Sequence, residues 1–179
     1  MIGHLPQPAT SIIDEIKNRA ADGPLSPFEF AQFRKKANAL KSNDTENAFA
    51  ALGILACLEG NLDECRKNHE MALLYAKSPS IQLSNYAGSL FVIGLHQESF
   101  DLAQKARAMD ATNPAALEVC IRASFELGYE EQYLGYAAEW QKLTGEAHPT
   151  YALYLDEVQD ANELTACCTH GALHVGGGC

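Results

Sequence analysis

The chain has 179 residues, of which 47% are hydrophobic and 20% are charged, and its formal net charge is -10 at pH 7. This length allows one sizeable core, and the acidic balance disfavours binding to nucleic acid or to anionic membrane surfaces. The N-terminus lacks the features of a secretory signal and no window approaches the roughly 20 apolar residues of a membrane span, so we expect a cytoplasmic protein with reduced cysteines.

Residues 1–43 predict an N-terminal helical cap. An apolar stripe marks the first helix over residues 10–21, and it is formed by Ile12, Ile13 and Ile16. A turn follows at Asp22-Gly23-Pro24, and Ser26 with Glu29 then forms the S-x-x-E pattern that begins a second helix. We expect the two helices to pair as a degenerate first unit.

Residues 44–147 contain an internal repeat of 34 residues. Gly60, Gly94 and Gly128 keep this spacing. Other columns of mostly small or apolar residues share it: Phe49, Leu83 and Leu117; Leu52, Tyr86 and Cys120; Gly53, Ala87 and Ile121; His69, Ala103 and Ala137; Ala72, Ala106 and Trp140. A helical hairpin that stacks on copies of itself needs glycine at its turn, small residues where helices approach, and large apolar residues between hairpins. The spacing therefore predicts three such hairpins.

The first half of each unit resembles the tetratricopeptide repeat family, whose 34-residue helical hairpins carry a W-x2-L-G-x2-Y pattern. The three stretches read FAALGILACLEG (49–60), LSNYAGSLFVIG (83–94) and LEVCIRASFELG (117–128). Phe49, Leu52 and Gly53 match the start of the pattern. The resemblance implies an all-α fold, a right-handed α-solenoid with capping helices at both ends.

The same resemblance implies a concave groove lined by the first helix of each unit. The candidate groove residues are Ile54, Cys57, Leu58, Ile81, Asn85, Phe91, Val92, Arg122 and Phe125. Some family members hold a peptide carboxylate with lysine at the fifth position, but that position here holds Ala50, Ser84 and Glu118. We therefore expect a protein or peptide partner with an apolar anchor, and a basic one given the acidic chain. The alternative is that the chain's own tail or a second copy, as in a homodimer, covers part of this surface.

The C-terminal part divides into a helix over residues 148–164, expected to cap the last hairpin, and a tail over residues 165–179. The tail holds soft metal ligands at Cys167, Cys168, His170, His174 and Cys179, which would suit zinc. Three other interpretations of this tail remain: it undergoes thiol exchange, it is the modified segment of a peptide precursor, or it is a disordered end. A protein that acts through it is our alternative function.

The sequence shows no catalytic signature. His69 lies in a packing column and His96 follows a hairpin glycine, while no nucleophile elbow or phosphate-binding loop is present. We therefore predict a non-enzymatic adaptor, chaperone or assembly factor without a cofactor.

Overall fold

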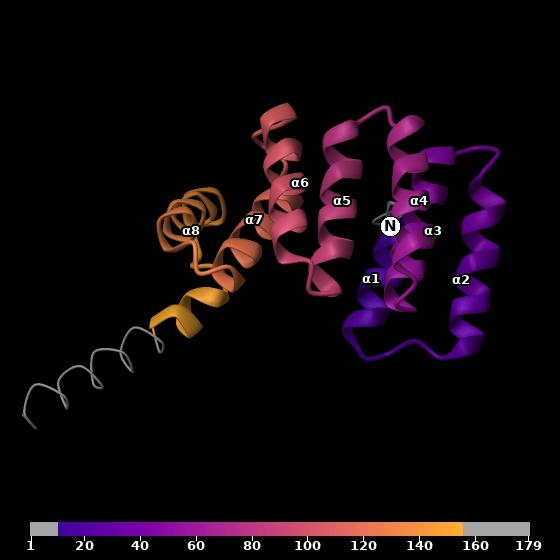
Figure 1. Ribbon diagram of the computed structural model, residues 1–179, viewed down its shortest axis with the longest axis horizontal. Helices are drawn as coiled ribbons and strands as arrows, with labels where there is room; N and C mark the ends of the chain where they lie inside the picture. The colour runs from indigo at the N-terminus through magenta and orange to yellow at the C-terminus, as the bar shows by residue number, and fades with distance from the viewer. Residues whose placement is uncertain (1–10, 156–179) are drawn as a thin grey trace, which may run out of the picture. The chain divides into compact units, whose positions relative to one another are not determined.

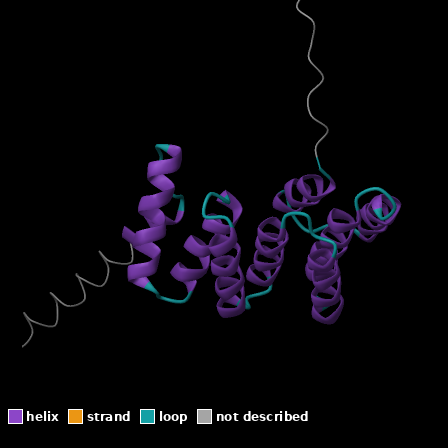
Figure 2. Cartoon of the chain, turned by 90° about the horizontal axis from the view of Figure 1, so that it is seen from above, coloured by secondary structure: helices purple, strands orange, loops and turns teal. Residues whose placement is uncertain are grey.

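The computed structural model describes residues 11–155, and every regular element within them is a helix (Figure 1). In chain order these helices include α1 (Ile12–Ala21), α2 (Pro27–Leu40), α3 (Thr45–Leu58), α4 (Leu62–Leu74), α5 (Pro79–Val92), α6 (His96–Met109), α7 (Pro114–Glu126) and α8 (Glu130–Thr144). A further helical stretch begins at Thr150. Figure 2 shows these helices joined only by loops. The predicted all-α class is confirmed.

Contacts divide the chain into two units, one ending at Ala123 and the other beginning at Ser124. In the first unit α3 pairs with α4 and α5 pairs with α6 as hairpins, and α3 also packs against α5. Helices thus pack against their neighbours in sequence order, which confirms a solenoid-like repeat fold. The predicted border at residue 43 falls in the loop between α2 and α3.

The repeating glycines occupy the turn that ends each first helix. Gly60, Gly94 and Gly128 have φ values of +77, +80 and +67°, a left-handed region in which a Cβ atom is unfavourable. The residue after each glycine donates a backbone hydrogen bond to a carbonyl five residues earlier, as from Asn61 to Ala56 at 2.9 Å. This is the Schellman ending of a helix, and it explains the glycine column physically.

Local signals place the helix starts as predicted. The Ser26 side chain accepts a hydrogen bond from the Glu29 backbone, and the Glu29 carboxylate accepts one from the Ser26 backbone, so the capping box is present. Helices α5 and α7 begin at Pro79 and Pro114, where a missing N–H leaves no hydrogen bond unmade.

The first two helices contact each other, and both also contact α3. Helix α1 packs against α3, and Figure 1 shows α1 and α2 on opposite sides of α3 in that view. The apolar stripe of α1 joins a core with residues of α2 and α3, where Ile16 is fully buried.

Candidate functional site

The candidate site is the face of the first unit that the first helix of each hairpin contributes. Three of its predicted groove residues are buried in the chain: Ile54 is 7%, Cys57 3% and Asn85 7% exposed. Side chains this buried offer almost no surface to a second molecule while the chain holds this conformation. The buried residues of α3 and the buried Asn85 of α5 are covered by different contacts.

Helix α1 covers the α3 part of this face. Ile12, Ile13 and Ile16 belong to one core cluster with Ala50 and Ile54 of α3. Ile54 is one of the candidate groove residues, and Ala50 occupies the fifth position of the same unit. The chain thus covers part of its own surface. The alternative given above expected the tail or a second copy in this place, whereas here the N-terminal helix provides the cover.

A polar contact extends this cover to α5. Lys17 Nζ of α1 donates a hydrogen bond to Asn85 Oδ1 of α5 at 3.0 Å. Lys17 is exposed as a residue, yet desolvation of its ammonium lowers the pKa of Lys17, against the opposing effect of nearby Asp14. Asn85 is therefore already occupied by a hydrogen bond from within the chain.

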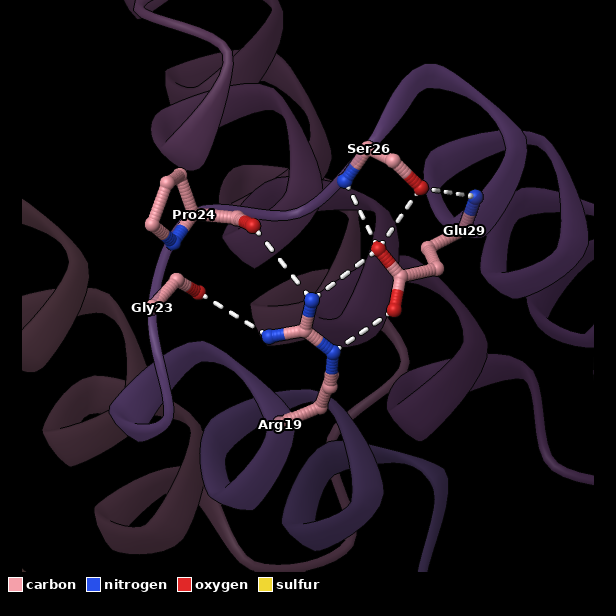
Figure 3. Close-up of polar contacts among 5 residues, drawn as sticks. All are labelled: Arg19, Gly23, Pro24, Ser26 and Glu29. Carbon is pink, nitrogen blue, oxygen red and sulfur yellow. Dashed lines mark hydrogen bonds and ion pairs between the residues drawn. The ribbon is translucent and has the colours of Figure 1, made fainter.

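One part of the link between α1 and α2 is polar (Figure 3). Arg19 Nε lies 2.6 Å from Glu29 Oε1, and the same guanidinium donates to the carbonyl oxygens of Gly23 at 3.1 Å and Pro24 at 3.4 Å. Hydrogen bonds from Arg19, together with those from Ser26, lower the pKa of Glu29 to about 2. Glu29 thus stays ionised and serves both the cap of α2 and the tie to α1.

An open cleft separates α1 from α2. Its volume is about 420 Å³, and it is lined by Glu15, Asn18, Arg19, Asp22, Glu29, Gln32, Phe33 and Lys36. Lys36 Nζ and Glu15 Oε2, 2.7 Å apart, form a second ion pair between the two helices. Charged groups line most of the cleft. Helix α1 is held to α2 by these ion pairs and by the apolar core cluster that it shares with α2 and α3.

The α5 part of the face remains open. Ile81 is 50% and Val92 63% exposed, although both are large and apolar. Eleven residues separate them, which brings them to nearly the same side of a helix at 100° per residue. Phe91 is half-buried beside them, with the guanidinium carbon of Arg122 4.5 Å from its ring centroid. We call Ile81, Phe91, Val92 and Arg122 the open surface.

Two predicted groove residues remain to be placed. Leu58 is half-buried at the end of α3. Phe125 belongs to the second unit, where its ring lies 5.5 Å from that of the buried Tyr133. Of the nine predicted residues, the four of the open surface are thus at least partly exposed in the first unit.

Sequence reasoning passed over a buried polar cluster behind this face. His69 is fully buried, its Nε2 lies 2.9 Å from Ser89 Oγ, and its ring stacks on Tyr86 at 4.7 Å. Cys57 Sγ donates to the Ser89 carbonyl at 2.9 Å, and contact with Cys65 together with burial raises the pKa of Cys57. The cluster fixes α4 and α5 against α3 through polar contacts.

The sequence did carry a signal for this cluster. A Cβ added to Gly53 would lie 2.7 Å from His69 Cδ2, so the imidazole occupies the space that an alanine at 53 would need. One repeat later both positions hold alanine, Ala87 and Ala103. One repeat thus pairs glycine with a large residue, and the next repeat pairs two alanines at the same positions. Because the volumes of the two residues change in opposite directions, the two positions are expected to be in contact.

The second unit has a pocket of its own, of about 310 Å³, lined by Leu134, Ala137, Ala138, Gln141, Ala147, His148 and Tyr151. Trp140 lies edge-on to the buried His148 at 5.1 Å. The Tyr154 ring lies 5.3 Å from that of Tyr133, as expected of a helix that covers the last hairpin. The rest of this predicted capping helix lies outside the described residues.

The tail candidates Cys167, Cys168, His170, His174 and Cys179 also lie outside the described residues. Between residues 11 and 155, no group of three or more His, Cys, Asp or Glu side chains is arranged to hold a metal ion. Over the same range, no helix combines the length and the apolar character that crossing a bilayer requires.

No protein-family model matches this chain, and a comparison with curated proteins gave no match. The class that the structure defines is therefore an all-α helical repeat of which one face is partly covered by its own first helix.

Proposed function

We propose that the chain is a tetratricopeptide-like interaction module, an adaptor, chaperone or assembly factor, that binds a protein segment on its open surface. The observation that carries the proposal is the difference between equivalent positions of α3 and α5. Leu58 is half-buried, whereas Val92, 34 residues later, is 63% exposed. At another pair of equivalent positions, α3 has the polar Asn47 and α5 has the exposed, apolar Ile81.

The open surface suits a partner with an apolar anchor. Ile81 and Val92 each offer apolar area whose burial is worth on the order of 1 kcal/mol or more. Arg122 lies over the Phe91 ring in a cation–π contact, so this apolar surface has one positive charge at Arg122. The net charge of -10 favours encounter with basic partners over acidic ones.

A photo-crosslinking experiment tests the proposal. A photoreactive residue replaces Val92 in one protein and Lys67, an exposed residue of the outer helix α4, in a control protein. We expect one adduct, identified by mass spectrometry, from position 92 and its absence from position 67. A Val92→Glu change should abolish binding of the same partner, whereas Leu74→Glu, at a side chain 72% exposed on α4, should not.

Adducts that form equally from both positions would contradict the proposal. The same experiment with a chain ending at Leu164 addresses the alternative function. Loss of every adduct on removing residues 165–179 would move the function from the open surface to the tail.

A further inference from the structure

Helix α1 is seated on α3 in the way a bound helix is seated on a receptor. It directs Ile12, Ile13 and Ile16 into the core, at 7, 7 and 0% exposure, and it reaches α5 with Lys17. This is the helix-in-groove mode, in which apolar residues one turn apart anchor an amphipathic helix. The face of α3 and α5 therefore has the shape and chemistry of a helix-binding surface.

The attachment of α1 to the rest of the chain is limited. It has 10 residues, too few for a stable helix in isolation, so it depends on its docked position. Its loop to α2 contains Gly23, at φ +133°, followed by Pro24. Besides the apolar cluster that it shares with α2, its ties to α2 are ion pairs whose side chains are 28 to 56% exposed. Exposed ion pairs of this kind contribute little to stability.

We propose that α1 is an exchangeable occupant of this face, and that the partner is an amphipathic helix of the same chemistry. The partner helix carries β-branched apolar residues at its first, second and fifth positions and a basic residue at the sixth, as Ile12, Ile13, Ile16 and Lys17 do in α1. This proposal rests on the proposed function and specifies its partner. It also gives a structural basis for a basic partner, because Asn85 Oδ1 accepts from an ammonium.

A longer helix has a physical advantage over α1. Ten residues of helix span about 15 Å. Helix α1 leaves Ile81 and Val92 exposed, and a longer partner helix that covers α3 and also these side chains buries apolar area that α1 does not. That additional burial offsets the advantage that α1 gains from being part of the same chain.

The test uses the full chain and a labelled synthetic peptide of residues 11–22, with an Ile13→Asp peptide as control. The variant Lys17→Ala/Arg19→Ala/Lys36→Ala removes the polar ties of α1 and leaves its isoleucines in place. We expect this variant to bind the peptide about tenfold more tightly than the unchanged chain, because it reduces the population in which α1 blocks the site. The control variant Arg66→Ala, which breaks the exposed Arg66–Glu98 pair, should leave the affinity unchanged.

Hydrogen exchange of the unchanged chain supplies a second measurement that needs no variant. The amides of α1 should exchange at least tenfold faster than those of α3 and α4, through opening of α1 alone. Equal protection of α1 and α3 would overturn the proposal.

Two other results would also overturn it. One is a failed peptide test: the proteins bind the peptide and its Ile13→Asp control with equal affinity, or none of the proteins binds the peptide. The other is a dimer that Ile13→Asp in the full chain abolishes, which would make a second copy the occupant. Because the test uses only the helix of this chain, its failure leaves the crosslinking result at Val92 standing, and the two proposals fail separately.

Discussion

Lys17 and Asn85, 68 residues apart in the chain, are joined by a 3.0 Å hydrogen bond that ties the N-terminal helix to the second hairpin. Asn85 is buried, and its side-chain nitrogen also donates to Gln82 Oε1 at 3.4 Å. The contact therefore satisfies a buried amide and an ammonium at once, and it makes α1 part of the repeat region.

Replacing Asn85 should show the energetic weight of this contact. We expect Asn85→Ala to lower the free energy of unfolding by about 1 to 2 kcal/mol, because the ammonium of Lys17 loses its acceptor. Urea denaturation measures the change. Asn38→Ala, at an exposed position of α2, is the control and should shift stability by less than about 0.5 kcal/mol. Equal effects of the two changes would contradict the expectation.

The Gly53–His69 contact predicts a coupled pair of substitutions. Gly53→Ala alone should cost about 1 to 3 kcal/mol, because its Cβ would lie 2.7 Å from the imidazole. Adding His69→Ala should recover at least about 1 kcal/mol, since alanine at both positions is the arrangement of Ala87 and Ala103. A double-mutant cycle by denaturation measures this coupling. Strict additivity of the two changes would show that the clash is absent.

The hairpin glycine predicts a conformational cost without a packing cost. Gly60 has φ +77° and no atom within 4 Å of an added Cβ, so Gly60→Ala should destabilise by about 1 kcal/mol through strain alone. Gly135 also has open space but no positive φ and lies within α8. There Gly135→Ala should stabilise by up to about 1 kcal/mol, and thermal unfolding of both variants provides the comparison.

Glu29 predicts a pH dependence with a definite sign. Its pKa is about 2 in the folded chain against an ordinary value of 4.5, so the ionised form favours folding. The stability that it contributes is fully present above about pH 5 and is lost as the pH falls toward 2. Glu29→Gln should therefore flatten the acid limb of a stability profile between these values. An unchanged slope in that variant would show that the Arg19–Glu29 pair adds no stability.

Local chemistry alone fixed much of the fold. The 34-residue spacing required a glycine with positive φ at every hairpin turn, and the Ser26–Glu29 cap and the two prolines placed helix starts where they are found. Each of these signals acts within a few residues, so the sequence displays it directly. The volume exchange between Gly53 with His69 and Ala87 with Ala103 was equally visible, but its meaning depended on knowing that the two positions touch.

The candidate site depended on tertiary structure. The isoleucine stripe of α1 predicts that one face of this helix is buried. The periodicity does not show which helix packs against that face. Packing of α1 on α3 buried Ile54, and the Lys17 contact engaged Asn85, while Ile81 and Val92 stayed exposed. Residues at equivalent positions of the repeat thus acquired different exposure because the choice of packing partner is non-local, and only the folded chain decides it.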